Sequence, residues 1–512
     1  MATMFDDIIV GAGSSGAVLA ARLSEDPRRR VLLLEAGPDY PTVEATPADL
    51  RDSTWISVVA HDWGFRADAV KGREIEFPRG KVTGGSSAVN ASIALRGVPE
   101  DYDEWARLGN DEWAWARVLP YFRRLEDDQD EMGAFHGKGG PIPVRRWRPS
   151  ELMPVQGAFA EACQAMRFPP VKDHNHPEAT GIGSWPMNIR DGLRVSTAVG
   201  YLLPARSRPN LVIRSGCLVD RVVVEGSRVV GVDLVEGEGR ERVLGRRVTL
   251  SAGAIGSPAI LLRSGIGPRD DLDALGIAPP LDLSGVGTNL IDHPQAGVAL
   301  VPRPGVCAPG QPVVQMGLRY TAPASGERND MQLAMISQAD LTQIPAVMAL
   351  VEAPMVFSVI AALQRPRSRG RLWLTSPDPR AQPRIDLHYL DDPEDMRRMV
   401  EGVRLAWQVS RWPALAERTE RIAILTEEMV ASDEILEGYL QMAVNTLYHP
   451  VGTARMGPEG DAAAVVDQLG RVRGLEALRV VDASMMPNIP RANTNLTCIM
   501  MGERVADWMR AE

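Results

Sequence analysis

The stretch Phe5-Asp6-Asp7-Ile8-Ile9-Val10-Gly11-Ala12-Gly13-Ser14-Ser15-Gly16 decides the fold. Its first half predicts a short apolar strand, and the glycines that follow predict a tight turn. Small and apolar residues from Ala17 to Ser24 then keep helical spacing. A second strand is predicted over Val31 to Leu34, and it ends at Glu35, about 20 residues beyond the turn. This order predicts the strand, turn, helix and strand that open a dinucleotide-binding domain.

Each part of this pattern has a physical reason. Glycines let the backbone approach a pyrophosphate closely, and a helix N-terminus offers it free N–H groups and partial positive charge. A carboxylate at Glu35 can accept a hydrogen bond from a ribose hydroxyl. A Gly-x-Gly-x-x-Gly turn alone is a weak signal, and an ordinary glycine turn is the alternative. The flanking strands and the acid in register favour dinucleotide binding.

Length and composition indicate a soluble globular protein. The 512 residues exceed one ordinary domain, so two interleaved domains are expected. Hydrophobic residues make up 45% and charged residues 24% of the chain, and the net charge of -10 gives no basic surface for nucleic acid. The longest apolar run, Val347 to Leu363, is interrupted by Glu352 and Pro354 and is shorter than the roughly 20 residues of a membrane-spanning helix. It predicts either a buried element of the second domain or the lining of an apolar pocket.

The spacing of cysteines and histidines indicates whether a metal site is expected, and the N-terminal sequence indicates whether a signal peptide is expected. Cys163, Cys217, Cys307 and Cys498 are widely separated and form no metal-binding spacing, so reduced thiols are expected. His174 and His176 flank Asn175 in a proline-rich turn without further ligands nearby, which predicts a solvated loop and no metal site. The first strand begins within about five residues of the N-terminus, which leaves no room for a signal peptide. We therefore expect a cytoplasmic protein that binds no membrane.

A second glycine-rich stretch runs from Pro78 to Ile93 and contains Gly84-Gly85-Ser86-Ser87-Ala88. Consecutive small residues form a backbone-rich surface that a flat ring or a phosphate can approach. A flexible surface loop is the alternative. The apolar residues from Ile93 to Leu95 indicate burial and favour the binding role.

The middle of the chain predicts a return to the nucleotide-binding domain and then a second domain. A passage rich in Pro, Gly and charge, Glu126 to Pro149, predicts a boundary. Short strands separated by glycine turns are predicted at 211–213, 221–225, 229–235 and 247–250. From about Pro294 to Leu447, strands such as Met331 to Ile336 alternate with amphipathic helices such as Pro393 to Val409. This region predicts a substrate-facing domain.

The candidate for chemistry is His449, which lies between Tyr448 and Pro450 and precedes Gly-Thr-Ala-Arg-Met-Gly. A neutral imidazole can accept a proton near pH 7, so a rigidly held histidine suits a general base. Asn493 follows a predicted strand, Leu478 to Val481, and opens a C-terminal helix near Asn495. A core histidine hydrogen-bonded to a backbone carbonyl is the alternative.

Taken together, these motifs resemble those of the glucose-methanol-choline (GMC) oxidoreductases over essentially the whole chain. Gly11 to Gly16 with Glu35 is similar to the family's FAD turn, and Gly253 to Gly267 fits its second sequence pattern position by position. Gly80 to Asn90 fits the first pattern except at Thr83, where the family usually has an aliphatic residue. Further matches are Gly285-Val286-Gly287, Asn289-Leu290, Asp292-His293-Pro294, Ser368-Arg369-Gly370 and Asp482-Ala483-Ser484.

The resemblance implies an α/β fold, α+β overall, with a Rossmann-like FAD-binding domain and a substrate-binding domain that contains a large antiparallel or mixed sheet. The FAD-binding domain would comprise residues 1–150, 206–293 and 448–512. The substrate-binding domain would comprise residues 151–205 and 294–447. A monomer or homodimer is expected.

The resemblance also implies site residues. It makes His449 the active-site base and Asn493 its partner. The implied FAD-binding residues are Gly11, Gly13, Ser14, Ser15, Gly16, Glu35, Ala36, Val82, Gly84, Gly85, Ser86, Asn90, Ala91, Ser92, Ile93, Val219, Ala252, Gly253, Asp482, Ala483, Asn493, Thr494 and Asn495. Some members attach FAD covalently through a histidine beside the Gly-Gly-Ser-Ser run. Here that neighbourhood is Ala88-Val89-Asn90, so FAD is expected to be non-covalent. His293 is expected to be structural, in an Asp-His-Pro turn, with nearness to the cofactor as the alternative.

The family contains several activities. Its choline-oxidising branch holds the cationic substrate with a glutamate, and an approximate register places Gln315 or Met316 there, which argues against choline. The resemblance favours oxidation of a benzylic, furanic or medium-chain primary alcohol to the aldehyde, with oxygen as acceptor and hydrogen peroxide as product. An FAD-dependent dehydrogenase that uses a quinone or another acceptor is one alternative. A hydroxynitrile lyase with structural FAD is another.

Overall fold

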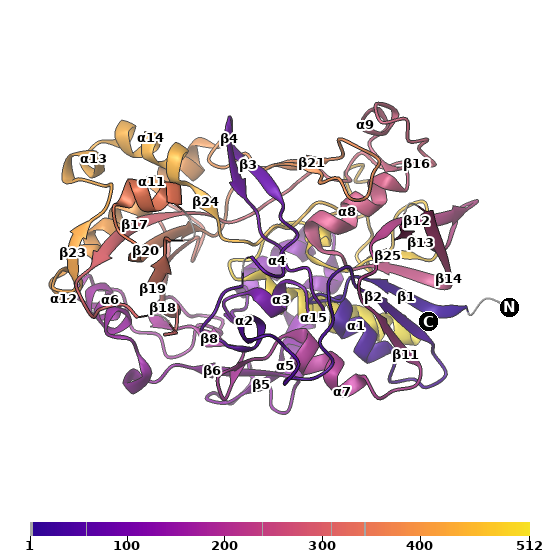
Figure 1. Cartoon of the computed structure of the whole chain (residues 1–512), viewed down its shortest axis with the longest axis horizontal. Coiled ribbons are helices and arrows are strands. Elements are labelled where there is room, and N and C mark those ends of the chain that lie inside the picture. Colours follow the sequence, from indigo (N-terminus) through magenta and orange to yellow (C-terminus); the bar gives the residue numbers. More distant parts are fainter. Residues whose placement is uncertain (1–3, 58, 238, 309, 343–344) are drawn as a thin grey trace.

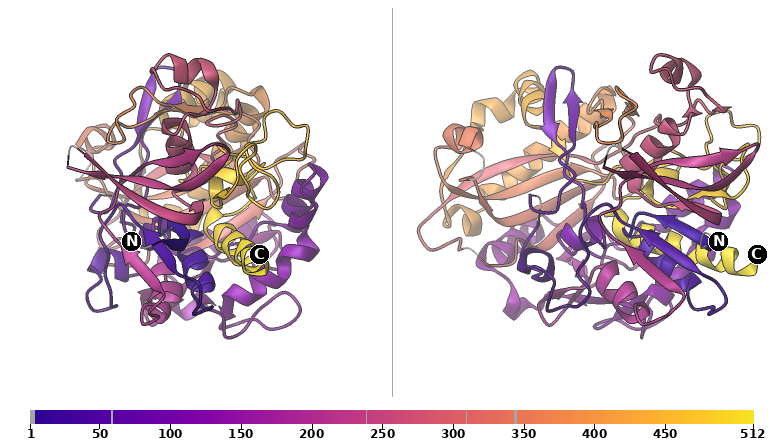
Figure 2. Two further views of the ribbon diagram at one scale, coloured as in Figure 1. Left: turned by 90° about the vertical axis from the view of Figure 1, so that its right-hand side faces the viewer. Right: turned by 45° about the vertical axis from the view of Figure 1, so that its right-hand side comes forward.

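The protein is represented by a computed structural model that describes residues 4–57, 59–237, 239–308, 310–342 and 345–512. Two large sheets lie at opposite ends of the molecule, with the hairpin β3–β4 and several helices between them (Figure 1). Both chain ends lie at the end that holds the first large sheet (Figures 1 and 2). The predicted α/β class is confirmed.

The first large sheet contains the predicted nucleotide-binding strands. Its order is β11-β2-β1-β14-β13-β12, and β25 also pairs with β14. β11, β2, β1, β14 and β25 pair in parallel, whereas β12 and β13 form an antiparallel extension of β14. The bounds are β1 Phe5–Val10, β2 Val31–Leu34, β11 Leu211–Arg214, β12 Val219–Glu225, β13 Arg228–Glu236, β14 Gly239–Leu250 and β25 Leu478–Val480.

Burial on both faces of the sheet explains why these strands consist of consecutive apolar residues. A parallel sheet is covered on both faces, and every residue of β2 is accordingly buried. Helix α1 (Gly16–Leu23) packs on β1 and β2, and the C-terminal helix α15 (Thr494–Ala511) packs on α1. Helix α8 (Gly253–Arg263) packs against β12. The two glycine-led helices α1 and α8 therefore begin where β1 and β14 end.

The second large sheet is antiparallel, with the order β23-β17-β20-β19-β18-β7, and β24 pairs with β17. Helix α11 (Pro393–Ser410) covers β17, β19 and β20, and α6 (Pro154–Ala165) packs on β18 and β19. The bounds are β7 Gly181–Ser184, β17 Pro294–Pro302, β18 Val314–Tyr320, β19 Met331–Asp340, β20 Met355–Leu363, β23 Thr419–Ile422 and β24 Asn445–Thr446. One sheet face is therefore covered by helices, which leaves the other available to a cavity.

Smaller sheets and helices complete the structure. The small sheets have the orders β21-β22-β3-β4, β5-β6-β8, β9-β10 and β15-β16. Their bounds are β3 Arg66–Val70, β4 Arg73–Glu76, β5 Glu126–Asp128, β6 Ile142–Arg146, β8 Pro186–Met187, β9 Ile189–Arg190, β10 Leu193–Arg194, β15 Ile266–Gly267, β16 Leu281–Asp282, β21 Arg371–Trp373 and β22 Arg384–Asp386. The other α-helices are α2 Ala48–Arg51, α3 Ser86–Val89, α4 Pro99–Arg107, α5 Trp115–Leu125, α7 Leu203–Ala205, α9 Arg269–Asp273, α10 Pro345–Val351, α12 Pro413–Ala416, α13 Glu427–Ala431 and α14 Asp433–Ala443.

The strands of the two large sheets follow the predicted segments. All strands of the first come from 1–150, 206–293 and 448–512, and all strands of the second come from 151–205 and 294–447. The smaller sheets cross these segments, because β3 pairs with β22 and β6 pairs with β8. The domain boundaries themselves remain a prediction.

Three sequence expectations need refinement. The apolar run Val347 to Leu363 is divided between α10 and β20, with the left-handed residue Glu352 (φ 54°) between them. The passage Glu126 to Pro149, which was predicted as a boundary, contains the strands β5 and β6. His174 is buried and its Nε2 lies 3.1 Å from the Gly317 carbonyl oxygen, so the prediction of a solvated loop was wrong for it, whereas His176 is exposed.

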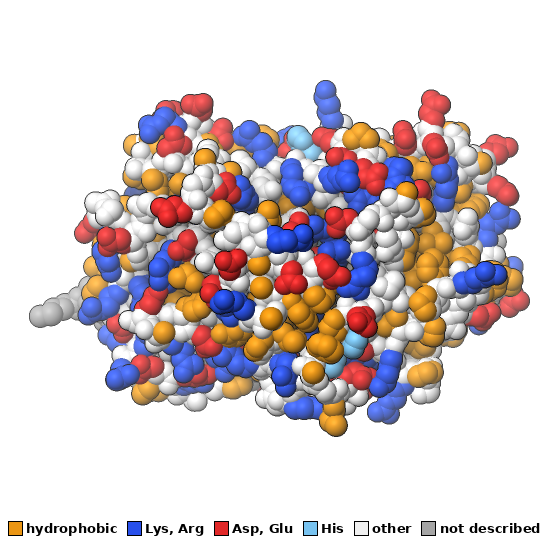
Figure 3. All heavy atoms as spheres, turned by 180° about the vertical axis from the view of Figure 1, so that it is seen from behind, with side chains coloured by type: hydrophobic (Ala, Val, Ile, Leu, Met, Phe, Trp, Pro, Cys, Tyr) orange, Lys and Arg blue, Asp and Glu red, His pale blue; other side chains and the backbone are white. Residues whose placement is uncertain are grey.

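The charges on the surface and the hydrophobicity of the helices relate to the expected absence of nucleic-acid and membrane partners. Basic and acidic side chains are interspersed over the face seen in Figure 3, without a continuous basic stripe. Among the described helices, even the long α11 and α15 lack the sustained apolar sequence that crossing a bilayer requires.

Candidate active site

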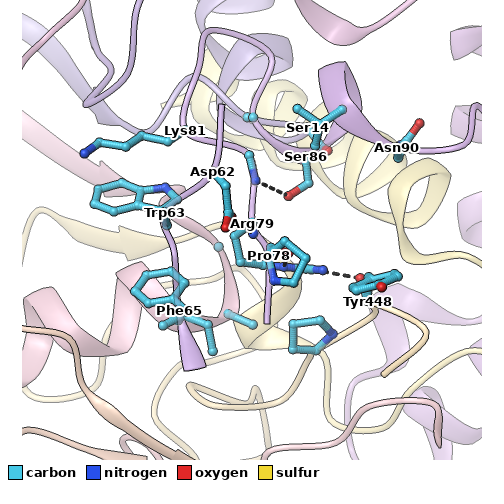
Figure 4. Close-up of a pocket in the computed structure, with 18 of the residues that line it drawn as sticks. Ser14, Asp62, Trp63, Phe65, Pro78, Arg79, Lys81, Ser86, Asn90 and Tyr448 are labelled. Carbon is cyan, nitrogen blue, oxygen red and sulfur yellow. Dashed lines mark hydrogen bonds between the residues drawn. The ribbon is translucent and has the colours of Figure 1, made fainter. Parts of the chain in front are cut away.

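A cavity of about 980 Å³ joins the edges of the two large sheets. Gly11, Glu35 and Ala252 line it from the first sheet, and Gln295 and Ile360 line it from the second. Figure 4 shows part of its wall, where Ser14, Ser86 and Asn90 lie on one side and Tyr448 and Arg79 lie below them. The glycine-rich turns and the predicted base therefore share one cavity.

The N-terminal turn is shaped by close backbone contacts. Gly11 has φ +97°, and a Cβ there would lie 2.5 Å from the Ser251 carbonyl oxygen. A Cβ at Gly16 would lie 1.9 Å from the Gly11 carbonyl oxygen. Gly16 supports the turn from behind, since it is not among the residues that line the cavity, whereas Gly13, Ser14 and Ser15 are. In the first turn of α1, the backbone N–H groups of Ala17 and Leu19 donate to the carbonyl oxygens of Gly13 and Ser15. The positive end of the helix therefore adjoins the part of the cavity that Gly13, Ser14 and Ser15 line.

Glu35 closes the turn. Its carboxylate accepts hydrogen bonds from the backbone N–H groups of Ala12 and Gly37, each at 2.9 Å. Burial raises its pKa to about 7, although these hydrogen bonds favour the charged form. Each carboxylate oxygen has a further lone pair, so the side chain can also accept from a ribose hydroxyl in the cavity that it lines.

The second glycine-rich turn touches the first. Gly85 has φ +52°, and a Cβ there would lie 2.7 Å from Gly13 Cα. Ser86, Asn90, Ala91 and Ile93 line the cavity beside this contact.

Three of the predicted cofactor residues in this stretch do not line the cavity. Val82 packs with Leu50 and Ala88 in a small apolar cluster. Gly84 faces Ala88 and Ala198, and the Ser92 hydroxyl accepts a hydrogen bond from Arg194. These positions shape the loop from behind.

The remaining predicted cofactor residues line the part of the cavity near the end of β25 and the starts of α8 and α15. Asp482 accepts hydrogen bonds from the Gly253 backbone (2.9 Å) and the Ser257 hydroxyl (2.5 Å), which connects β25 to the start of α8. The Ser14 hydroxyl donates to Asn495 at the N-terminus of α15. The lining residues of this part are Ala36, Val219, Ala252, Gly253, Asp482, Ala483, Thr494 and Asn495.

His449 lies where the chain leaves β24. Its Nε2 is 3.1 Å from the Asn493 amide nitrogen, and its Nδ1 is 3.0 Å from His293 Nδ1. The Asn493 amide nitrogen can only donate, so with the amide in this orientation Nε2 of His449 is the acceptor and its proton sits on Nδ1, directed at His293. Asn493 is the N-cap residue of α15, but its side chain does not cap that helix. The amide is therefore free to serve the base.

The surroundings keep this histidine neutral. Burial lowers the pKa of His449 well below its ordinary value, and electrostatic interactions with His293 and with the Arg79 guanidinium lower it further. Burial also lowers the pKa of His293 to about 3. Among the described residues, no carboxylate pairs with either imidazole ring. Both histidines are thus neutral at pH 7.

A buried carboxylate fixes the backbone of this site. Asp292 Oδ1 accepts from the N–H groups of His449 (2.7 Å) and His293 (2.8 Å), and Oδ2 accepts from the hydroxyls of Tyr389 and Thr446. The Thr446 hydroxyl in turn accepts from the Tyr448 N–H at 2.7 Å. Asp292 thereby fixes the main chain at both His449 and His293.

Tyr448 precedes the base in an unusual conformation. Its φ of 66° lies in the left-handed region, which costs a non-glycine residue of the order of 1 kcal/mol. The Arg79 guanidinium donates to its carbonyl oxygen at 2.8 Å, as Figure 4 shows. This clamp connects the second glycine-rich stretch to the base.

The expectation that His293 is only structural is incomplete. The structure places it in contact with the base, so it belongs to the site. Asp292 and Arg79 were not predicted as site residues. The Asp-His-Pro sequence at 292–294 was the available signal for the first, but no local pattern pointed to Arg79.

The positions expected to face the substrate also need correction. The Gln315 side chain contacts the backbone of Met153 and Glu151, Met316 is buried in the main hydrophobic core, and neither lines the cavity. Val313 and Val314 line the cavity instead. From the apolar run Val347 to Leu363, Met355 and Ile360 are the described cavity-lining residues.

Two sequence models, both described as GMC oxidoreductase, match residues 5–295 and 366–502. The chain belongs to the GMC oxidoreductases. It is 36% identical to a 5-(hydroxymethyl)furfural oxidase of Methylovorus sp., over 99% of this chain and 98% of the relative. It is also 36% identical to an oxygen-dependent choline dehydrogenase of Chromohalobacter salexigens, over 99% and 95%. The crystal structure of pyridoxine 4-oxidase from Mesorbium loti superposes with a TM-score of 0.90 and 32% identity, covering 99% of both chains.

FAD is the cofactor of this oxidoreductase. The cavity suits it because side-chain-free turns at Gly11, Gly13 and Gly85 meet the N-termini of α1 and α15, which can hold a pyrophosphate and a flat ring. Val89 lines the cavity where a covalent histidine attachment would require an imidazole. Non-covalent binding is consistent with that residue.

Proposed function

We propose that this enzyme oxidises a neutral primary alcohol, such as a benzylic, furanic or medium-chain alcohol, to the aldehyde. The observation that supports this most strongly is the environment of His449. Its ring is neutral, its Nε2 faces the Asn493 amide at 3.1 Å, and it lines the cavity that holds the FAD-binding turns. FAD supplies a hydride acceptor at its N5 atom when it is bound.

His449 is the base in this proposal. An incoming hydroxyl takes the place of the Asn493 amide at Nε2 and gives its proton to that nitrogen as the hydride leaves the carbinol carbon. The Nδ1 hydrogen bond to His293 holds the tautomer that leaves Nε2 free to accept. A positioned base of this kind contributes roughly 100-fold or more to the rate.

Asn493 stabilises the substrate oxygen. Its amide can donate a hydrogen bond to the developing alkoxide and orient the alcohol against the base. The N-terminus of α15, which follows Asn493 directly, presents partial positive charge to the same cavity and favours negative charge on the reduced cofactor.

The charges of the cavity argue for a neutral substrate. Arg79 lies beside the base, and the nearby carboxylates of Glu35, Asp62 and Asp482 accept hydrogen bonds from the backbone. A quaternary ammonium would find Arg79 instead of a free carboxylate next to His449. Identity alone does not distinguish the substrates, because a furanic-alcohol oxidase and a choline dehydrogenase are equally similar to this chain.

Oxygen is the proposed acceptor, with hydrogen peroxide as product. The names of two similar proteins, an oxidase of 5-(hydroxymethyl)furfural and an oxidase of pyridoxine, support it. A dehydrogenase that passes electrons to a quinone is the second candidate, because Tyr448 is partly exposed beside the base and is placed to restrict the approach of oxygen.

Anaerobic mixing tests the proposal. The FAD-loaded enzyme is mixed with benzyl alcohol, furfuryl alcohol, hexanol and choline, and flavin bleaching is followed before air is admitted. Bleaching by the neutral alcohols, little by choline, and stoichiometric peroxide after air support an alcohol oxidase. Bleaching without peroxide assigns a dehydrogenase. Cleavage of mandelonitrile without bleaching by any alcohol contradicts the proposal in favour of a lyase.

A further inference from the structure

The second large sheet contributes a long wall to the cavity. Val314 from β18, Ala334 and Ile336 from β19, and Ile360 from β20 form this wall, which we name the apolar trough. Alternate residues of a strand point to the same face, so Ala334, Ile336 and Gln338 follow one another along the cavity. The trough is thus a feature of the sheet's regular geometry.

The trough begins at the base. The strand β17 starts directly after His293, and the Gln295 side chain donates to the Thr446 carbonyl oxygen at 2.7 Å, close to His449 in the chain. Gln295 pairs with Ala362 on the neighbouring strand β20. Two positions further along β17, Gly297 lies on the same sheet face and pairs with Ile360. Ile360 in turn pairs with Ala334. Ala334 and Ile360 therefore mark the inner end.

The trough extends well beyond this point. Gln338 lies four positions beyond Ala334, which at about 3.4 Å per residue corresponds to roughly 14 Å. Gly310, Val313 and Met355 line the cavity around its outer end. A single aromatic ring at the base would occupy only part of that length.

The chemistry of the trough is apolar. Among the described lining residues that β17 to β20 contribute, Asp340 is the only ionisable one, and it lies at the exposed outer end. Ile336 is half-buried in the middle of its sheet, and it packs beside the buried cluster that contains Val314. Apolar surface left open inside a cavity is stabilised by an apolar ligand.

We infer that the apolar trough binds the tail of an elongated primary alcohol whose hydroxyl lies at His449. This inference rests on the proposed function and defines its substrate class as unbranched or aryl-extended alcohols longer than a single ring. The tail displaces water from Ile336 and Val314, while the oxidised carbon stays beside the base.

Chain length gives the first test. Anaerobic flavin reduction by butanol, hexanol, octanol and decanol is measured, and each further methylene buried in the trough raises kcat/KM by up to about fourfold. Benzyl alcohol serves as the reference for the chemical step. A flat or falling series overturns the inference, and no reduction by any alcohol contradicts the proposed function instead.

A blocking variant gives the second test. Ile336→Trp fills the middle of the trough, so it is expected to lower kcat/KM for decanol at least tenfold and to leave benzyl alcohol within about threefold. Leu350→Trp makes the same kind of change at an exposed position of α10 outside the cavity and is the matched control. Equal losses for decanol and benzyl alcohol in Ile336→Trp overturn the inference.

A second variant covers the case in which the tryptophan prevents folding. Gln338→Leu extends the apolar surface at the outer end of the trough and is expected to raise kcat/KM for decanol by about twofold to fourfold, with butanol unchanged. An unchanged or reduced preference for decanol contradicts the inference.

Discussion

Two buried histidines of this enzyme differ in charge: His449 is neutral and His136 is positively charged. His449 has His293 and Asn493 around its ring, and burial together with nearby positive charge lowers its pKa well below the ordinary value. His136 is as deeply buried, and burial also disfavours its charge, but hydrogen bonds with Asp128, Asp173 and Glu126 outweigh that effect and raise its pKa to about 10. The partners of a buried imidazole, and not its burial alone, decide its protonation.

The two sites also differ in what they are suited to do. Both ring nitrogens of His136 contact carboxylates, and Arg146 binds Asp128 and Asp173, so this cluster is a neutralised ionic network. Glu126, Asp128 and His136 have the proximity of metal ligands, but Arg96 and Arg146 already supply cationic partners to the carboxylates. His449, in contrast, keeps one nitrogen available to a substrate. One histidine stabilises the fold and the other is suited to catalysis.

The largest expected effect follows removal of the neutral histidine. His449→Ala is expected to lower the rate of anaerobic flavin reduction at least about 100-fold, because the alcohol loses its proton acceptor. The absorbance ratio of protein to bound FAD should match that of the unmodified enzyme, since the hydrogen bonds of the ring go to His293 and Asn493 and not to the two glycine-rich turns. A near-normal rate in stopped-flow measurements would remove His449 as the base.

Replacement of the charged histidine, His136, is expected to lower stability instead of activity. His136→Gln leaves buried carboxylates without one of their cations, which costs about 3 kcal/mol in the free energy of unfolding. Denaturation in urea measures the loss, and flavin reduction per bound FAD should stay within about twofold. If His136→Gln is as stable as the unmodified enzyme but reduces flavin more slowly, the structural role that we assign to His136 is contradicted.

Asn493→Ala separates the contribution of the amide donor from that of the base. Loss of the amide donor is expected to slow flavin reduction by about tenfold, less than loss of the base, because His449 still accepts the proton. Asn488→Ala, at a neighbouring asparagine that binds Glu104 away from the cavity, is the matched control. An equal loss in both variants would indicate a packing effect.

The smallest effect is the pH dependence of stability. The folded pKa of His136 lies above its unfolded value of about 6.5, so its contribution is complete below pH 6.5 and is lost as the pH rises towards 10. The difference in unfolding free energy between the unmodified enzyme and His136→Gln should therefore shrink across that interval. A difference that is constant from pH 6.5 to 9.5 would contradict a charged His136.

The contrast also shows where the sequence was informative. The FAD turn from Gly11 to Gly16, Glu35 and the C-terminal segment with Asn493 were predictable because local periodicity and glycine spacing specify them. The second large sheet was predicted only in part, since its strand order depends on pairings between distant segments. Local patterns reveal the elements but not the partners that they meet.

The partners of the two histidines illustrate this limit. His136 lies in the passage Glu126 to Pro149, whose content of Pro, Gly and charge predicted a boundary. Several of its charged residues form a buried network, because Arg96, Arg146 and Asp173 converge there in space. Gln315 or Met316 was expected to face the substrate, but Val313 and Val314 line the cavity instead. A register error of one residue moves a side chain to the other face of a sheet.

The most direct test of the account is the pH dependence of flavin reduction, because its central claim is a base that stays neutral. kcat/KM for benzyl alcohol is measured anaerobically from pH 5.5 to 7.5, with the residual rate of His449→Ala as the control for other titrating groups. A pKa well below 6.5 predicts values that agree within about twofold after this correction. A loss of about tenfold between pH 7.5 and 5.5, the behaviour of an imidazole with its ordinary pKa, would contradict the claim.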